Sequence, residues 1–344
     1  MTLMIPRSWC RGFAAAGLLL ASACTPTSQF TAEQLAQLST LAEQVETDRL
    51  MEDVRQLGEN HSEEQPLSCT DIQRDNYTPA CHLTRNAARE MMKRRFEEFA
   101  DRGMQVRLQA GQRGGLQFTN VLADLPGTTR KDEIVLVGAH FDAFYMGADD
   151  NSTGVAGVLE LARILSQYQF ERTIRFVGFD LEEPGDIGSG HYVDEFGKEK
   201  LVGAIIFDCI GYYDTKPGSQ LSIPGLPAPS AGDFLAIIGN DNSLPMATEL
   251  HQLNDHLKFM KLMSIIAPGD GTKAAPISSS LMRSDHMPFW YNGDNVLFLT
   301  DTANFRNPNY HRDTDVIDTL TPDLFRRAVQ VSAVGLATWA GGPR

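Results

Sequence analysis

The chain has 344 residues, of which 42% are hydrophobic and 22% charged, and its formal net charge is −14. This composition is typical of globular proteins and excludes a collagen-like fibre, a disordered chain and a polytopic membrane protein. We expect no nucleic-acid partner, because a phosphate backbone attracts basic rather than acidic surfaces. The length suits one large domain, or one such domain with a small appendage.

The first 23 residues have the features of an export signal. Arg7 and Arg11 supply positive charge, and a short apolar stretch and three small residues follow. Cys24 then stands where a bacterial lipobox has its lipidated cysteine, although the same residues also fit ordinary signal-peptidase cleavage. We therefore expect residues 1–23 to be a signal peptide and residues 24–31 to be a tether. The mature protein is then either a lipoprotein of the cell envelope or periplasm, anchored to the membrane through Cys24, or a secreted protein.

The remaining cysteines agree with an exported protein. Cys69 and Cys81 bracket a polar stretch and predict a local disulfide, which would stabilise the fold by roughly 3 kcal/mol in the chain-entropy picture. Cys209 lies within an apolar run and is predicted to be a buried free thiol.

The pattern of apolar residues predicts one α/β domain over 32–344, with an N-terminal helical extension over 32–100. The predicted elements, in chain order, are helices over 32–57 and 84–100; strands over 104–110, 116–125 and 133–139; a helix capped by Ser152; strands over 173–179, 201–207, 234–239 and 296–299; and a helix that starts at Thr321 and runs to about Trp339. Strands that alternate with helices indicate a mostly parallel central sheet with helices on both faces.

Polar residues follow the ends of the buried strands. In open α/β sheets, ligands bind outside the carboxyl ends of the strands, so these residues are expected to meet. The predicted cluster consists of His140, Asp149, Glu183, Asp208 and His311. Histidine and carboxylate ligands without a thiolate favour zinc, and five such groups suit two ions bridged by one carboxylate.

The residues next to the cluster suggest catalytic roles. Adjacent glutamates point in different directions, so Glu183 can bind metal while Glu182 acts as the general base. Asp142 lies two residues after His140 and is placed to accept the second N–H of its imidazole.

These segments resemble zinc-dependent metallopeptidase family 28, which contains bacterial leucyl aminopeptidases and, among its relatives, glutaminyl cyclases and carboxypeptidases. The resemblance rests on H-x-D at 140–142, G-A-D-D at 147–150, E-E at 182–183 and the later Asp208 and His311, in that order. It implies an α/β/α sandwich and two zinc ions per chain.

The same resemblance assigns individual ligands. His140 and Asp208 would bind one zinc ion, Glu183 and His311 the other, and Asp149 would bridge them. Asp150 and Asp285 are expected to act behind the ligands or on the substrate.

The sequence therefore predicts an exported zinc exopeptidase, most simply an aminopeptidase acting on peptides or proteins with a free N-terminus. A hydroxide held between the ions would attack the peptide bond, with Glu182 as general base. The alternatives are a one-zinc glutaminyl cyclase, and a carboxypeptidase or dipeptidase of the same family. Phe144, Tyr145 and the segment 289–291 are candidates for an apolar side-chain pocket.

Overall fold

The computed structural model describes residues 2–4, 30–67, 82–222, 226, 228–272 and 277–343. Cys24, Cys69 and Cys81 lie outside these ranges, so lipidation and the disulfide stay predictions. Cys209 is buried with a free thiol, as predicted. None of the helices in the described part of the chain is long and apolar enough to cross a membrane.

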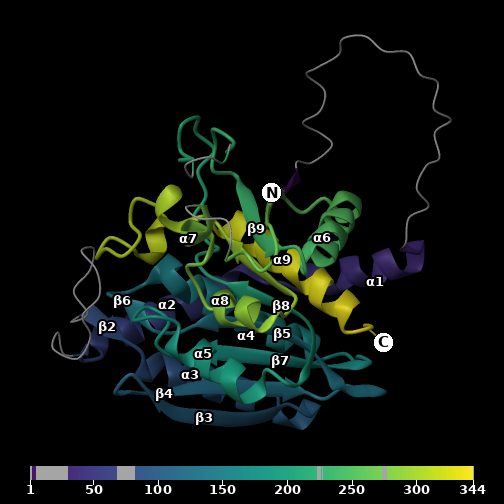
Figure 1. The fold of residues 1–344 in the computed structure, drawn as a ribbon, viewed down its shortest axis with the longest axis horizontal. Coiled ribbons are helices and arrows are strands. Elements are labelled where there is room, and N and C mark those ends of the chain that lie inside the picture. The colour runs from purple at the N-terminus through teal and green to yellow at the C-terminus, as the bar shows by residue number, and fades with distance from the viewer. Residues whose placement is uncertain are drawn as a thin grey trace.

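A twisted mixed sheet forms the centre of the molecule (Figure 1). The strand order is β1-β10-β9-β11-β8-β5-β7-β4-β3. The strands are β1 (Thr2–Met4), β3 (Gln105–Arg113), β4 (Leu116–Leu125), β5 (Arg130–His140), β7 (Arg172–Phe179), β8 (Lys200–Phe207), β9 (Phe234–Asn240), β10 (Lys261–Ala267) and β11 (Val296–Thr300). Parallel pairing joins β11, β8, β5 and β7 in the middle of the sheet, whereas β4 and β3 extend one side antiparallel.

Helices cover both faces of this sheet, which confirms the predicted fold class. The helices are α1 (Ala32–Glu43), α2 (Thr47–Glu63), α3 (Asn86–Glu97), α4 (Gly154–Leu165), α5 (Ile187–Phe196), α6 (Leu244–Leu257), α7 (Ile277–Leu281), α8 (His286–Asn292) and α9 (Pro322–Trp339). Successive side chains of β5 alternate between two cores. Val135 and Val137 pack with residues of α1–α4, α6 and α9, whereas Leu136 packs with residues of α5 and α8.

The N-terminal extension differs from the prediction at two points. The expected helix over 32–57 is broken into α1 and α2, because the chain turns at Val45 and the backbone N–H of Glu46 is bound by the buried Glu160 carboxylate (2.8 Å). Thr84 does not cap the next helix: it lies in the short strand β2 (Leu83–Thr84), which pairs with β6 (Ala143–Phe144).

The cap of α3 is supplied by Glu64. Its carboxylate accepts hydrogen bonds from the backbone N–H groups of Asn86 and Ala87 at 3.0 and 2.9 Å. A carboxylate at a helix N-terminus satisfies unpaired backbone donors and complements the helix dipole.

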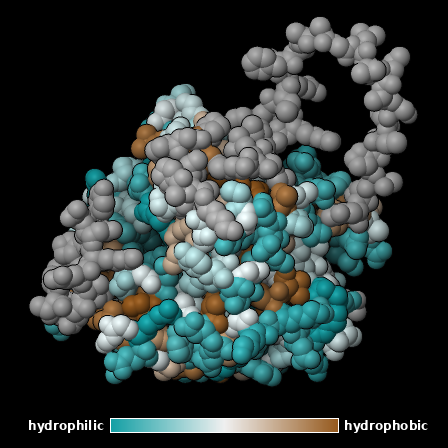
Figure 2. Space-filling model, in the orientation of Figure 1, coloured by the Kyte–Doolittle hydropathy of each residue, from teal (hydrophilic) through white to brown (hydrophobic). Residues whose placement is uncertain are grey.

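The visible surface is mainly polar. Figure 2 shows a largely teal face with separate brown patches rather than one continuous apolar area. Among the described residues, the large hydrophobic side chains that are well exposed are Leu108, Leu221 and Tyr291.

Candidate active site

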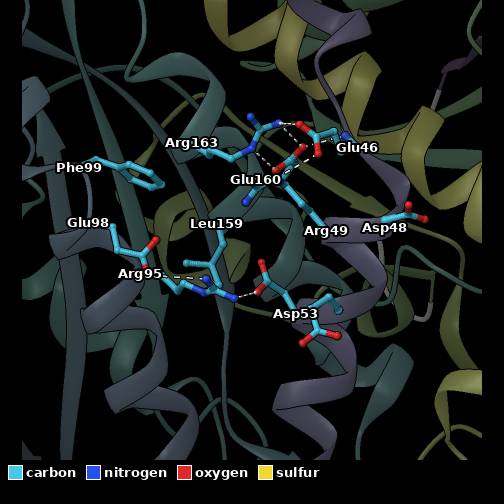
Figure 3. A pocket seen from close by; sticks show the side chains of 11 residues that line it. Glu46, Asp48, Arg49, Asp53, Arg95, Glu98, Phe99, Leu159, Glu160 and Arg163 are labelled. Carbon is cyan, nitrogen blue, oxygen red and sulfur yellow. Dashed lines mark hydrogen bonds and ion pairs between the residues drawn. The ribbon is translucent and has the colours of Figure 1, made fainter.

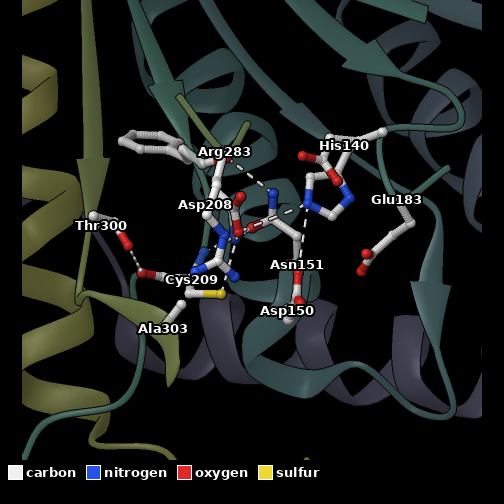
Figure 4. A network of polar contacts seen from close by, with 12 residues as sticks. His140, Asp150, Asn151, Glu183, Asp208, Cys209, Arg283, Thr300 and Ala303 are labelled. Atoms are coloured by element: carbon white, nitrogen blue, oxygen red, sulfur yellow. Dashed lines mark hydrogen bonds and ion pairs between the residues drawn. The ribbon is translucent and has the colours of Figure 1, made fainter. Parts of the chain in front are cut away.

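Three neighbouring strands bring predicted site residues to one edge of the sheet. β8, β5 and β7 lie side by side and run parallel, so their carboxyl ends meet at that edge. His140 is the last residue of β5, Asp208 follows β8 directly, and Glu183 lies in the loop after β7. Figure 4 shows these side chains gathered in one network together with Asp150.

Two groups of potential ligands share one carboxylate. In the first group, His140 Nε2 lies 3.4 Å from Asp150 Oδ1 and 3.7 Å from Asp208 Oδ1. In the second group, His311 Nε2 lies 2.9 Å from Asp150 Oδ2 and 3.2 Å from Glu183 Oε2. Within each group, the ligand atoms lie within 4.8 Å of one another. Asp150 therefore presents one oxygen to each group.

The prediction that Asp149 occupies the shared position is wrong. The Asp149 carboxylate points away from both groups, where it accepts hydrogen bonds from the Gly211 backbone N–H (2.9 Å) and from Asn307 Nδ2 (2.8 Å). Both aspartates lie in the single helical turn η4 (Ala148–Thr153), and neighbours in such a turn point in different directions. The sequence pair Asp-Asp does not say which member faces the histidines.

A residue that sequence reasoning missed holds this turn. The buried Asp315 carboxylate accepts hydrogen bonds from the backbone N–H groups of Asp149 (3.0 Å) and Asp150 (3.1 Å). Asp315 lies four residues after His311 in a polar loop, and nothing in that loop distinguishes it from the solvent-facing Asp313. Its contact fixes the backbone on which Asp150 stands.

Asp142 orients the site in a different way from the one predicted. His140 Nδ1 lies 3.0 Å from the backbone carbonyl oxygen of Asp142 and 3.6 Å from its carboxylate, so the carbonyl is the nearer partner. The Asp142 carboxylate instead accepts the backbone N–H groups of Glu182 (3.0 Å) and Glu183 (3.2 Å). One residue thus fixes both the imidazole and the two glutamates.

Burial and close charges shift the pKa values in the cluster. Burial raises the pKa of Glu182 well above its ordinary value, and it raises the pKa of Glu183 to about 7 against the influence of His311. Burial alone would lower the pKa of both histidines, but the surrounding carboxylates raise the pKa of His140 well above its ordinary value and that of His311 to about 10. Protons on these groups therefore balance the buried charge, and a divalent cation would displace them.

The donors present fit a divalent metal such as zinc. His140 Nε2 and Glu183 Oε1 are buried and make no hydrogen bond to the described residues. Buried polar atoms of this kind are costly unless a ligand uses them. Imidazole nitrogens with carboxylate oxygens are common zinc ligands, and a shared carboxylate is typical of two-metal sites.

Asp285, predicted to act behind the ligands or on the substrate, lies outside both groups. It is fully buried at the start of α8, and burial raises its pKa well above the ordinary value.

The apolar pocket expected from the aromatic residues is not where the sequence placed it. Phe289 and Trp290 are buried in the core beneath the sheet, and the Tyr291 side chain is exposed. Phe144 does reach the site, with its ring 4.9 Å from that of His311. The cavity that adjoins the ligand groups has a volume of about 40 Å³, and its wall contains Asp208, Ala236, Ile238, Ile265, Phe298 and Phe305.

Comparisons with known proteins agree with this geometry. The sequence profile of peptidase family M28 matches residues 120–335. The Escherichia coli protein YfbL, described as uncharacterized, is 30% identical over 65% of this chain and 72% of its own length. Aminopeptidase YwaD of Bacillus subtilis is 41% identical over 22% of this chain, a match that spans only 17% of YwaD. The chain also superposes on the LapA aminopeptidase of Legionella pneumophila, with a TM-score of 0.67 and 16% identity over 94% of this chain and 79% of LapA.

The profile covers well over half of the chain and includes every residue of both ligand groups. The chain therefore belongs to peptidase family M28. It is a peptidase hydrolase by class.

Proposed function

We propose that this protein is a zinc-dependent exopeptidase, most simply an aminopeptidase that removes residues from the free N-terminus of peptides. The observation that carries the proposal is the Asp150 carboxylate, which faces one histidine–carboxylate group with each oxygen. His140 and Asp208 would complete one zinc site, and Glu183 and His311 the other. The proposal of two ions per chain rests on this sharing.

Zinc at these positions would polarise the scissile carbonyl and acidify the attacking water. Glu182 would accept the proton of that water at its carboxylate and return it to the nitrogen of the leaving amine. Burial raises its pKa above the ordinary value, which makes the Glu182 carboxylate a stronger base for this exchange. The Asp142 carboxylate would keep Glu182 in place through the backbone contact described above.

The small cavity beside Asp208 is our candidate for the site of the substrate's N-terminal side chain. Ile238, Ile265 and Phe298 give it an apolar wall. A volume of about 40 Å³ suits an aliphatic side chain better than an aromatic one. Acidic groups next to this cavity would attract the free ammonium group of the substrate.

We also propose that the protein is exported and either lipidated at Cys24 or secreted. The support is the basic, apolar and small-residue pattern of residues 1–23, directly before Cys24. Radiolabelled palmitate incorporation in the wild type and in Cys24→Ala would separate lipidation from plain secretion.

The test of the activity uses aminoacyl p-nitroanilides with free and N-acetylated amines, with and without a chelator. We expect hydrolysis only of the free amines, loss of activity on chelation and recovery with zinc. Glu182→Gln should abolish turnover and keep the zinc content of the wild type. Equal cleavage of acetylated substrates would contradict the aminopeptidase. Cyclisation of N-terminal glutamine with one zinc per chain would identify a glutaminyl cyclase instead.

A further inference from the structure

The loop that carries Glu182 and Glu183 has a backbone that is costly to maintain. It connects β7 to α5, and within it Leu181 and Asp186 have φ angles of 58° and 53°. Side chains with a Cβ are disfavoured in this left-handed region by roughly 1–2 kcal/mol per residue. Such a conformation persists only where surrounding contacts hold it.

The first restraint on this loop is the Asp142 carboxylate, which binds the backbone of both glutamates. The second lies at the start of the loop, at Asp180. The side chain of Asp180 is fully buried, and its Oδ2 accepts hydrogen bonds from Arg85 Nη1 (2.5 Å) and from the Thr119 backbone N–H (2.7 Å). The Asp180 backbone is held as well, because its N–H donates to Asn120 Oδ1 (2.9 Å).

Arg85 belongs to a different part of the chain. It stands between β2 and α3 in the N-terminal extension, outside the matched residues 120–335. Its own position is fixed, because Glu64 caps α3 directly after it and Nη2 donates to the Gln117 carbonyl (2.9 Å). The Arg85 side chain is only 13% exposed, so its ion pair with Asp180 is shielded from solvent.

The charge of Asp180 depends on this contact. Burial raises the pKa of Asp180 to about 6, and Arg85 is the leading influence that opposes the rise. Removing one partner of a buried ion pair leaves an uncompensated charge, which is much more disruptive than the loss of a surface pair. Asp180 stands two residues before Glu182, so its displacement would move that glutamate, whereas the Glu183 carboxylate is also held by His311.

We propose that Arg85 is a positioning residue for Glu182: by holding Asp180, the N-terminal extension fixes the loop that presents the general base. The inference rests on the proposed function for its catalytic consequence, but not for the structural effect on the loop. The N-terminal extension then contributes to catalysis through Arg85, in addition to packing against the sheet.

A matched control exists in the same layer of the molecule. Arg95 pairs with the largely buried Asp53 at 2.6 Å, between α3 and α2 (Figure 3). This pair resembles Arg85–Asp180 in type and partial burial, but it lies among the helices and touches none of the site residues. Arg95→Met should therefore lower stability and leave the catalytic loop unchanged.

The experiment compares Arg85→Met, Arg95→Met and the wild type by steady-state kinetics, zinc content, thermal melting and hydrogen–deuterium exchange of residues 180–186. We expect Arg85→Met to lower kcat by about tenfold to a hundredfold, since small misplacements of a catalytic group cost that much. KM and zinc content should be unchanged, and amide exchange in 180–186 should accelerate. Millimolar guanidinium should restore part of the lost kcat in Arg85→Ala.

The result that overturns the proposal is an Arg85→Met protein whose kcat and loop exchange match those of Arg95→Met. Loss of zinc together with kcat would also overturn it, because Arg85 would then support the metal ligands rather than Glu182. If Arg85→Met does not fold, Arg85→Lys and Asp180→Asn provide the same comparison with milder changes. If the wild type has no peptidase activity, the exchange data still decide whether Arg85 holds the loop.

Discussion

Replacing Asp150 and Asp149 separately by asparagine tests the geometry of the proposed metal centre. Asp150→Asn keeps the size of the side chain but removes the charge that lies between His140 and His311. Asp149→Asn makes the same chemical change one residue earlier, where the carboxylate faces Gly211 and Asn307. Comparing the two variants therefore distinguishes a residue that binds metal directly from one that only supports it.

The expected effects differ by orders of magnitude. Two unit charges about 4 Å apart attract by roughly 4 kcal/mol at an effective dielectric constant of about 20, and a divalent ion doubles that value. Each 1.4 kcal/mol is a factor of about ten. Asp150→Asn should thus weaken zinc binding by more than about a thousandfold at both positions. Asp149→Asn acts only through the turn, where changes behind the ligands cost about 10–100-fold in metal affinity.

The assay is zinc stoichiometry by inductively coupled plasma mass spectrometry after equilibration with a chromophoric chelator of known affinity. We expect the wild type to hold two zinc ions, Asp149→Asn to hold them more weakly, and Asp150→Asn to retain less than one. Circular dichroism of both variants controls for unfolding. An Asp149→Asn protein without zinc, beside an Asp150→Asn protein with two ions, would show that the assignment of the shared ligand is inverted.

Three further variants test other parts of the structure. Asp142→Asn replaces one of the two carboxylate oxygens that accept the backbone N–H groups of Glu182 and Glu183 by an amide donor. Because an unpaired buried group costs about 1–3 kcal/mol, kcat should fall by at least about tenfold. A variant with the kcat of the wild type would show that Asp142 does not hold these glutamates. Ile238→Ala enlarges the cavity beside Asp208 and should raise kcat/KM for phenylalanyl p-nitroanilide relative to leucyl p-nitroanilide. An unchanged ratio would show that the N-terminal side chain of the substrate binds elsewhere. For Asp53, a folded pKa of about 6 against an ordinary 3.8 means that the unfolded state ionises first, so its contribution to the free energy of unfolding falls as pH rises from about 4 to 6. As the pH rises from about 4 to 7, the difference in free energy of unfolding between Asp53→Asn and the wild type should therefore shift by up to about 3 kcal/mol in favour of Asp53→Asn, on top of the pH-independent cost of leaving Arg95 without its partner. Urea titrations at each pH measure this shift, and a pH-independent difference would argue against the burial effect.

Much of the fold and part of the site could be predicted from the sequence. The strand before His140 is a continuous apolar run, as expected for a strand buried on both faces, and its end marks the ligand edge of the sheet. The same reasoning located Asp208 and the two glutamates. These predictions succeeded because a strand's direction and its end are local properties of the chain.

The failures concern contacts between distant segments. The choice between Asp149 and Asp150 depends on which side chain the turn directs toward the histidines, and that is set by partners such as Asp315 far along the chain. Arg85 gave no signal because its role depends on Asp180, which is 95 residues away. The expected aromatic pocket failed for the same reason, because Phe289 and Trp290 are buried in the core and the cavity beside Asp208 is lined by other residues, among them Ile238, Ile265 and Phe298.

The placement of His140, Asp208 and Glu183 beyond three adjacent parallel strands has a consequence for metal selectivity. Neighbouring strands are spaced about 4.7–4.9 Å apart by their backbone hydrogen bonds, so the lateral separation of His140 and Asp208, at the ends of β5 and β8, is a property of the sheet. It does not depend on the ion that is bound. Manganese or cobalt should therefore be able to replace zinc without moving the scaffold, and the identity of the native metal would be decided by ligand chemistry and supply in the compartment where the protein matures.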